Sequence, residues 1–251
     1  NASENDIRPG GNPKASATRY RHYKDLLASD DIDAVIIATP DHWHSRISID
    51  AAKAGKHVYC EKGMTRTFDE AIDVYDSVKK TGITFQLGHQ NRQVEANEKA
   101  REIVQQGLLG PINLVEITTN RNSPWGAWVW GIHPKGNEQT IDWETFQEPS
   151  PNKIPFGEEA LKRFFRWRCW YDYGTGLSGD LFSHDFDAIN QIMDIGIPKY
   201  ASSTGGVYFY KDGRDVPDVW NATFEYPNKD LTLLYSASLS SNNPRGNRIM
   251  G

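Results

Sequence analysis

The chain has 251 residues, which is long enough for one sizeable core or for two packed domains of ordinary size. Its 28 Lys and Arg stand against 33 Asp and Glu, and the basic residues form no run that suits a phosphate backbone, so nucleic acid is not an expected partner. Two cysteines are too few for a disulfide framework, and no apolar stretch approaches the roughly 20 residues that span a bilayer. The compartment stays open between the cytoplasm and, for a polypeptide with a signal peptide before Asn1, the periplasm.

The first part of the chain alternates helical and strand-like segments. Helices are predicted over 20–29, 45–54, 68–81 and 94–106, and strands over 34–38, 57–60 and 83–87. The unbroken apolar run 34–38 is typical of a strand covered on both faces. Strands that alternate with helices form βαβ units and a parallel sheet. We therefore expect residues 1–111 to form a partial dinucleotide-binding domain of the Rossmann type, with a doubly wound parallel sheet.

The second part of the chain has a different pattern. Residues 220–226 and 231–239 alternate apolar and polar side chains on either side of the turn 227–230, which predicts an antiparallel hairpin with one buried face. We expect residues 112–251 to form an α+β domain with a largely antiparallel sheet. The predicted fold class is therefore α/β followed by α+β.

A glycine-rich segment in the second part matches a dinucleotide-binding fingerprint letter for letter. Gly174–Gly179 reads G-x-G-x-x-G, but the preceding residues 166–173 do not form the buried strand that the fingerprint needs. We interpret the segment as a turn that opens a helix.

The helix after this turn has one polar stripe and one apolar face. Asp180, His184 and Asp187 fall on the stripe, with Phe182 and Ile189 opposite. An Asp four residues before a His can orient the imidazole and support its charged form, as a general base requires. The alternative is an Asp that caps the helix beside a surface His, and the spacing alone leaves both readings open.

Lys62 directly follows the predicted strand 57–60, at the carboxyl edge of the sheet where ligands of such folds bind. A lysine there can polarise a substrate oxygen. The loops after the two neighbouring strands converge on the same edge. One of them contains His42-x-His44, but no cysteine or carboxylate cluster completes a set of metal ligands, so no metal is expected.

Three motifs follow one another along the chain. They are Asp31–Pro40 with His44 following, Ala54–Lys62, and Trp167-Arg168 ahead of Asp180-x-x-x-His184. Together they resemble the glucose-fructose oxidoreductase, inositol dehydrogenase and MocA-like family, called Gfo/Idh/MocA, from about Tyr23 to Leu239. The resemblance implies an oxidoreductase that uses NAD or NADP and transfers hydride at a hydroxyl or carbonyl group of a sugar or cyclic polyol.

The resemblance also implies roles for individual residues. Lys62 is the catalytic lysine, Asp180 helps to hold the substrate and the histidine, and His184 exchanges the proton of the alcohol. The residues expected beside the cofactor are Thr39, Pro40, Asp41, His44, Glu61 and Lys62. The residues expected to bind the substrate are Trp167, Arg168 and Asp187. The resemblance further implies that the domain 112–251 binds the substrate and that its sheet joins copies of the chain into a homo-oligomer.

The chain departs from the family's pattern in several places. Gly63 replaces the usual proline after Glu-Lys, which is expected to loosen the backbone beside the lysine. Phe182 replaces a common glycine and is expected to narrow the pocket. The family's first strand, glycine-rich turn and ribose-binding acidic residue would precede Tyr23, where Arg8–Asn12 cannot supply them, and its terminal strands are not expected after Leu239. We therefore expect a part of a longer polypeptide that binds a dinucleotide poorly by itself.

Two observations leave further alternatives open. Six of the eight tryptophans lie between Trp125 and Trp170, where their flat faces suit either sugar rings or the packing of loops. The family resemblance also favours a glycosidase that oxidises a sugar transiently with tightly held NAD, eliminates the aglycone and reduces the sugar again. The missing fingerprint and Gly63 favour a carbohydrate-binding protein without turnover.

Overall fold

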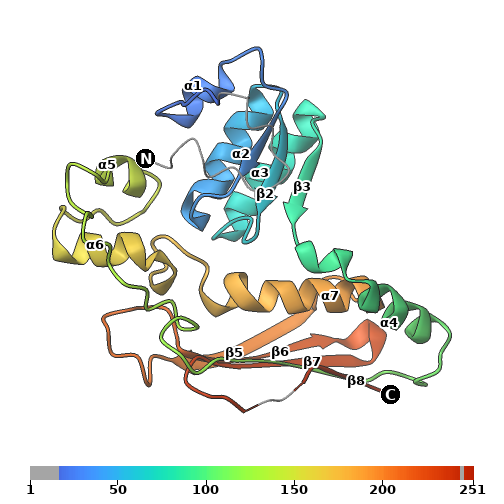
Figure 1. Ribbon diagram of the computed structural model, residues 1–251. Coiled ribbons are helices and arrows are strands. Elements are labelled where there is room, and N and C mark those ends of the chain that lie inside the picture. The colour runs from blue at the N-terminus through green and yellow to red at the C-terminus, as the bar shows by residue number, and fades with distance from the viewer. Residues whose placement is uncertain (1–16, 244–245) are drawn as a thin grey trace.

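The computed structural model describes residues 17–243 and 246–251, and it contains two β-sheets. Residues 17–88 form the upper part of the molecule in Figure 1, and the second sheet forms the base, with helix α7 running between the two. The predicted fold class is confirmed, because a parallel sheet of the Rossmann type is followed by helices and a largely antiparallel sheet.

The first sheet is parallel, with its strands in the order β1-β2-β3. The strands are β1 (Ala34–Ile37), β2 (His57–Glu61) and β3 (Phe85–Gly88). Ile37 lies beside Cys60, and Glu61 lies beside Gly88. This register brings the carboxyl ends of the strands to one edge, so the segments that follow them start close together.

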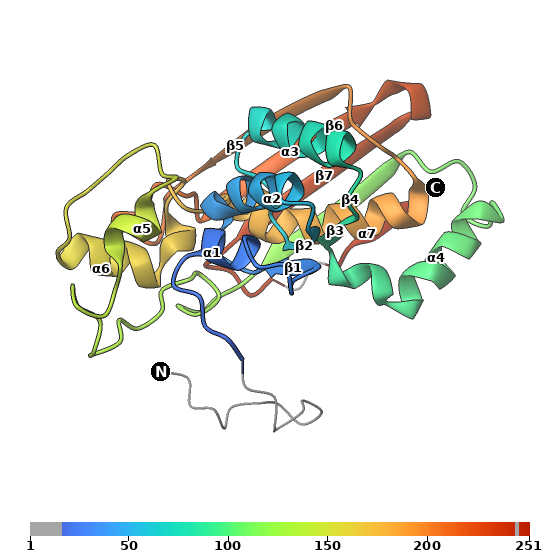
Figure 2. The ribbon, with the colours of Figure 1, turned by 90° about the horizontal axis from the view of Figure 1, so that it is seen from above.

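Helices cover one face of this sheet. They are α2 (His44–Lys53) and α3 (Phe68–Thr81), with the short α1 (Tyr23–Leu27) beside α2, as Figure 2 shows from above. The Thr67 hydroxyl accepts the backbone N–H of Glu70 at the start of α3, and Gly82, with a φ of 69°, ends that helix. Both signals can be read from the sequence.

The prediction that strand 34–38 is covered on both faces is wrong. Ile37 points toward the helices and is buried, whereas Ile36 points to the opposite face and is 78% exposed. Successive side chains of a strand alternate between faces, and the described helices that contact the sheet pack on the side of Ile37.

The second sheet has five strands in the order β5-β6-β7-β4-β8. They are β4 (Leu114–Asn120), β5 (Tyr200–Gly206), β6 (Val219–Tyr226), β7 (Leu231–Ser238) and β8 (Arg248–Met250). The predicted hairpin is confirmed as β6 and β7, while β4 and β7 form one parallel pair. The expectation of no strand after Leu239 is wrong, because the short β8 pairs with β4.

The helix α7 (Ser183–Met193) packs its apolar face on the second sheet, and a π-helical turn (Ser178–Phe182) leads into it. The ring of Phe182 stacks on Phe224 with ring centres 5.0 Å apart and lies 4.6 Å from Tyr235. Phe182 therefore belongs to the core between helix and sheet. The expectation that it narrows the pocket of the site is wrong.

Three further helices complete the second half. They are α4 (Glu95–Gln105), α5 (Trp143–Gln147) and α6 (Glu158–Phe165). Helix α4 lies alongside α7 at the right of Figure 1, and α5 and α6 contact each other at the left. None of the helices in the described ranges is long and apolar enough to cross a membrane.

The face of the second sheet turned away from α7 carries no helix among the described residues (Figure 1). It has a shallow hollow of about 460 Å³, lined mainly by polar side chains that include Glu116, Asn221, Thr223, Ser236 and Arg248. A homo-oligomer formed through this sheet stays a prediction.

The loop after β1 is attached to the second half of the chain through the buried His42. The His42 Nε2 lies 2.6 Å from the carbonyl oxygen of Phe146, and its backbone N–H donates to the carbonyl oxygen of Tyr173 at 3.2 Å. The imidazole also packs edge-on against both aromatic rings. Burial lowers the pKa of His42 to about 4, because the charged ring would lose its hydration. The ring is therefore neutral in the folded chain at pH 7.

This burial predicts a pH-dependent stability. The free energy of unfolding should fall by about 3 kcal/mol as the pH is lowered from 6.5 to 4, because the unfolded chain binds a proton at His42 near 6.5 and the folded chain only near 4. The contribution is complete above pH 6.5, is lost progressively as the pH falls below 6.5, and is gone once the folded chain also binds the proton below about 4. Urea unfolding at several pH values measures it. His42→Gln should lack this part of the pH dependence and the exposed-residue control His133→Gln should retain it, so equal curves for His42→Gln and wild type would contradict the prediction.

Candidate active site

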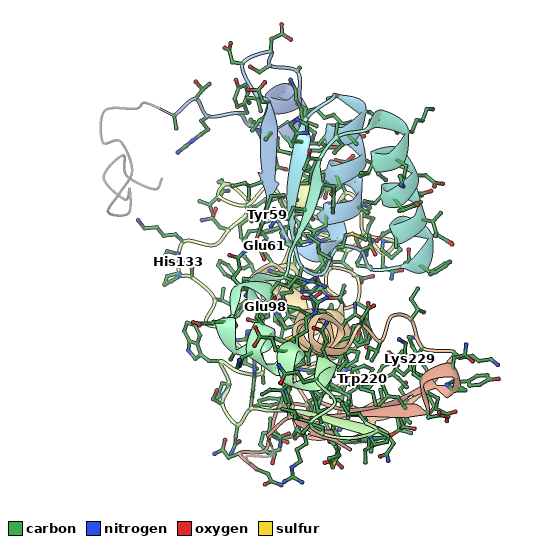
Figure 3. All side chains as sticks on the ribbon, turned by 90° about the vertical axis from the view of Figure 1, so that its right-hand side faces the viewer. Tyr59, Glu61, Glu98, His133, Trp220 and Lys229 are labelled. Carbon is green, nitrogen blue, oxygen red and sulfur yellow. The ribbon has the colours of Figure 1, made fainter. Side chains whose placement is uncertain are left out.

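The carboxyl edge of the first sheet faces the start of α7, and Lys62 connects the two. Figure 3 shows Glu61, the last residue of β2, at this junction. The Lys62 Nζ donates to Oδ1 of Asp180 at 2.7 Å and to the backbone oxygen of the same residue at 2.6 Å. The Nε of Arg168 donates to the same Oδ1 at 3.0 Å. Three predicted site residues, distant in the sequence, thus form one cluster.

Two cations share the single carboxylate of this cluster. Burial by itself raises the pKa of the Asp180 carboxyl, but the charges of Lys62 and Arg168 outweigh burial and hold this pKa below its usual range. Asp180 is therefore ionised at neutral pH. An ammonium group has three N–H donors, of which Asp180 accepts two. The third has no acceptor among residues 17–243 and 246–251, and it is available to the oxygen of a ligand.

The backbone beside Lys62 is tightly held. The two ring nitrogens of His44 lie 2.7 Å from the carbonyl oxygens of Gly63 and Thr39. Because a carbonyl oxygen only accepts, both contacts are hydrogen bonds when each ring nitrogen carries a proton. A Cβ at Gly63 would lie 3.2 Å from Oγ1 of Thr175, and this distance is shorter than nine in ten of the contacts that Cβ atoms make. These contacts surround Gly63, and the expectation that it loosens the backbone stays a prediction.

His184 lies at the start of α7 and borders a small polar pocket. The pocket has a volume of about 190 Å³ and is lined by Gln90, Asn91, Thr119, Arg121, Leu181, His184 and Asp185. Burial lowers the pKa of His184, and the charges of Lys62 and His89 lower it further, against the opposing charges of Asp180 and Asp185. The imidazole is therefore neutral at pH 7 and able to accept a proton.

Asp180 does not orient His184 in the way that their spacing suggests. Its Oδ1 accepts from Lys62 and Arg168, and Nδ1 of His184 has no hydrogen-bond partner among residues 17–243 and 246–251. The cause is the π-helical turn Ser178–Phe182, in which each turn holds an extra residue. Asp180 is thereby displaced from the stripe of a regular α-helix.

Asp187 binds an arginine from the segment after β3. The Arg92 Nε donates to both carboxylate oxygens of Asp187 at 2.9 Å. One turn later, the Gln191 amide donates to the backbone oxygen of Arg92 at 3.1 Å and to Glu98 at 2.6 Å. Glu98 is labelled in Figure 3 on the helix beside α7. The polar stripe of α7 thus holds the chain that follows the third strand.

Arg168 lies against two tryptophan rings. Its guanidinium carbon is 4.1 Å from the ring centre of Trp167 and 5.2 Å from that of Trp130, which is a cation-π arrangement. Three other tryptophans of this region are buried in the core, namely Trp128, Trp143 and Trp170. Packing therefore accounts for half of the tryptophan cluster, and the two rings at Arg168 lie next to the lysine and aspartate.

The residues expected beside a dinucleotide follow the first two strands. Thr39 and Pro40 come directly after the end of β1, and Glu61 ends β2 at the same edge. The Thr39 hydroxyl is buried and has no partner within the described ranges, so it suits a polar group of a ligand at this edge. Contact of Thr39, Pro40 and Glu61 with a dinucleotide stays a prediction.

Asp41 and His44, which were expected in the same group, are almost completely buried. The Asp41 carboxylate accepts the hydroxyl of Thr175 at 2.6 Å. Burial raises the pKa of Asp41, although Thr175 and the nearby His44 oppose that rise. Both side chains connect the loop after β1 to neighbouring segments.

The two glycine-containing segments have different outcomes. Arg8–Asn12, judged unable to supply the fingerprint, lie outside the described residues. Gly174–Gly179 follows the 3₁₀ helix Trp167–Cys169 and not a strand, which confirms its interpretation as a turn that opens a helix. Within the described part of the chain, no group of three or more His, Cys, Asp or Glu is placed to hold a metal ion.

Sequence reasoning missed several residues of this site. The segment after β3 was expected at the sheet edge, but individual roles for His89 and Arg92 were not foreseen. Thr175 lies within the apparent fingerprint Gly174–Gly179, and no role was predicted for it. Arg121 comes from the segment after β4, and no local pattern connects it to His184. The only available signal was the position of His89 at the carboxyl end of the third strand.

Comparison with known proteins supports the resemblance to the Gfo/Idh/MocA family. Over 204 residues the chain is 28% identical to levoglucosan dehydrogenase of Pseudarthrobacter phenanthrenivorans, covering 78% of this chain and 46% of that protein. Over 124 residues it is 34% identical to a glycosyl hydrolase family 109 protein of Shewanella pealeana, covering 46% of this chain and 27% of that protein. The chain spans about half the length, or less, of these curated relatives.

A solved structure of levoglucosan dehydrogenase, in complex with NADH and levoglucosan, has the same fold. Its TM-score is 0.65 at 23% identity, and the likeness covers 92% of this chain and 54% of that one. Residues 12–89 match the GFO_IDH_MocA model, an oxidoreductase family with an NAD-binding Rossmann fold. The resemblance to the Gfo/Idh/MocA oxidoreductase family that the three motifs indicated is confirmed, and residues 12–89 match the model of that family.

Proposed function

We propose that the protein is an NAD- or NADP-dependent oxidoreductase that transfers hydride at a hydroxyl or carbonyl group of a sugar or cyclic polyol. The observation that carries this proposal is Lys62, with one N–H available, at a sheet edge close enough to His184 for its charge to lower the pKa of that ring. The family of residues 12–89 and the similarity to a levoglucosan dehydrogenase support it.

The reaction follows from the charge states of these two groups. The substrate hydroxyl lies between them, so that the neutral His184 accepts its proton while Lys62 donates a hydrogen bond to the same oxygen. As the oxygen loses its proton it gains negative charge, and the ammonium group stabilises that charge. Nicotinamide bound at the sheet edge supplies the acceptor for the hydride of the carbinol carbon. Reduction of a carbonyl group runs in reverse, with His184 returning the proton.

The other predicted site residues take supporting roles in this proposal. Asp180 positions Lys62, and Arg168 with Trp167 contacts the substrate beside it. Asp187 acts through Arg92 and not on the substrate directly, since its carboxylate is already occupied. His44 binds the backbone oxygen of Gly63 beside the lysine, and Asp41 binds the hydroxyl of Thr175. Thr39, Pro40 and Glu61 would border the nicotinamide.

The pocket beside His184 suits a polyhydroxylated substrate. Its lining offers amide, hydroxyl, guanidinium and carboxylate groups, each able to donate or accept hydrogen bonds. Its volume of about 190 Å³ suits one sugar ring better than an extended chain.

A spectroscopic screen tests the proposal. The purified full-length protein is incubated with NAD⁺ or NADP⁺ and a panel of polyols, anhydrosugars and hexoses, and the absorbance of reduced nicotinamide is followed. We expect stoichiometric reduction with at least one member of the panel. The proposal would be rejected if no combination of nicotinamide and sugar or polyol changed the nicotinamide absorbance, whichever direction of the reaction is assayed. Tight binding of a sugar without any nicotinamide in calorimetry would instead favour a binding protein without turnover.

A glycosidase that works by transient oxidation is the second candidate, and the similarity to a glycosyl hydrolase family 109 protein favours it. The same lysine and histidine would serve the oxidation, and the hydride would return to the sugar after elimination. This function predicts release of the aglycone with no net change in nicotinamide. Assaying aglycone release and nicotinamide absorbance in one sample therefore separates the two candidates.

A further inference from the structure

A second histidine, His89, lies beside His184 at the junction between the first sheet and α7. It directly follows β3 at the carboxyl edge of the first sheet, and its ring centre is 5.9 Å from that of His184, with the rings nearly perpendicular. Nδ1 of each ring is buried without a hydrogen-bond partner among the described residues. The two imidazoles therefore meet at close range where neither is tied to a fixed partner through this nitrogen.

Charged groups surround both rings. Lys62 faces both of them, and on the His184 side the carboxylates of Asp180 and Asp185 partly oppose its charge. The first of these is bound to Lys62, and Asp185 accepts from Thr119 and Asn247. Around His89 stand Glu61, Asp187 and Arg92. The last two form an ion pair, whereas Glu61 and Asp185 have no cationic partner among the described residues and favour the charged form of the ring that each faces.

We propose that His89 is a positioning residue for His184, and that only one of the two rings carries an additional proton, and hence a positive charge, at a time. Two imidazolium groups at this separation repel each other, and Lys62 adds a third positive charge that both would face. For two unit charges about 6 Å apart in a partly buried site, this repulsion separates the two protonation steps by about one to two pH units. Binding of the first proton on either ring thus opposes binding of a second.

The pairing has a consequence for catalysis that rests on the proposed function. A site that admits one proton keeps His184 available as a base even when His89 is charged. The proton that His184 takes from an alcohol leaves the site from His184, while His89 stays neutral. His89 itself touches neither the substrate pocket nor the reacting atoms in this arrangement.

The pairing is tested by NMR titration of the histidine side chains in the ligand-free protein, which requires no turnover. In wild type we expect the His184 resonance to titrate in two steps, or in one broadened step with a Hill coefficient well below 1. In His89→Gln the same resonance should titrate in a single step of unit slope, with its midpoint shifted upward by several tenths of a unit or more. His184→Gln should simplify the His89 curve in the same way.

Two further variants keep the test decisive. His133→Gln, which removes an exposed histidine on a distant loop, should leave both curves unchanged. His89→Phe retains an aromatic ring for packing and serves if the glutamine variant fails to fold; it too should restore unit slope at His184. An unaltered His184 curve in a folded His89 variant would overturn the pairing. Coupled titration without hydride transfer would reject only the proposed function, and hydride transfer with independent titrations only this inference.

Discussion

Replacing Lys62 with methionine is expected to reduce kcat/KM for nicotinamide reduction by about a hundred- to a thousandfold. Methionine has a similar length but no N–H, so the oxygen that loses its proton would have no positive charge beside it. The measurement is the initial rate with the best polyol or sugar of the screen. Lys53→Met, at the exposed end of α2, removes a lysine far from the sheet edge and should leave the rate unchanged.

The Lys62 variant must also be shown to fold, because the lysine is one of two partners of a buried carboxylate. Arg168 still neutralises Asp180 in the variant, so the loss of stability should stay below the 3–5 kcal/mol that is typical when a buried charge loses its sole partner. Thermal unfolding monitors this. Lys62→Arg keeps the charge but not the compact donor geometry, and intermediate activity is expected. A folded methionine variant with wild-type rates would show that Lys62 does not act on the substrate.

Replacing His184 with glutamine is expected to lower kcat/KM by about a hundred- to ten-thousandfold, because the variant has no base to accept the hydroxyl proton. Burial, Lys62 and His89 all lower the pKa of His184. The wild-type profile of kcat/KM should therefore rise with pH through a midpoint below 6.5, the ordinary value for histidine, and level off at neutral pH. The residual activity of the variant should lack this rise.

The pH profile also distinguishes a base from a residue that only binds. If His184 merely held the substrate, glutamine would raise KM while kcat kept its dependence on pH. His133→Gln controls for general effects of removing a histidine. A wild-type profile with no inflection on the acid side, together with a fully active His184→Gln protein, would exclude the proposed role.

Local features of the sequence were sufficient for much of the fold. The apolar runs of β1 and β2, the cap at Thr67 and the stop at Gly82 depend on residues close together in the chain, as does the alternation that predicted the hairpin of β6 and β7. The position of Lys62 after a strand followed from the same local signals. The same signals did not show which face of β1 is covered, because Ile36 and Ile37 are equally apolar and differ only in what packs beside them.

The residues of the site also fall into those that local sequence signals located and those whose partners only the tertiary structure revealed. The sequence by itself determined that Lys62 stands at a sheet edge, that Asp180 and His184 open a helix, and that three ordered motifs resemble one family. Only the tertiary structure decided that Asp180 binds Lys62 and Arg168 instead of His184, that Asp187 binds Arg92, and that His89 faces His184. Periodicity and capping are properties of neighbouring residues, whereas these partners come from segments up to 118 residues apart that meet only when the two sheets pack around α7.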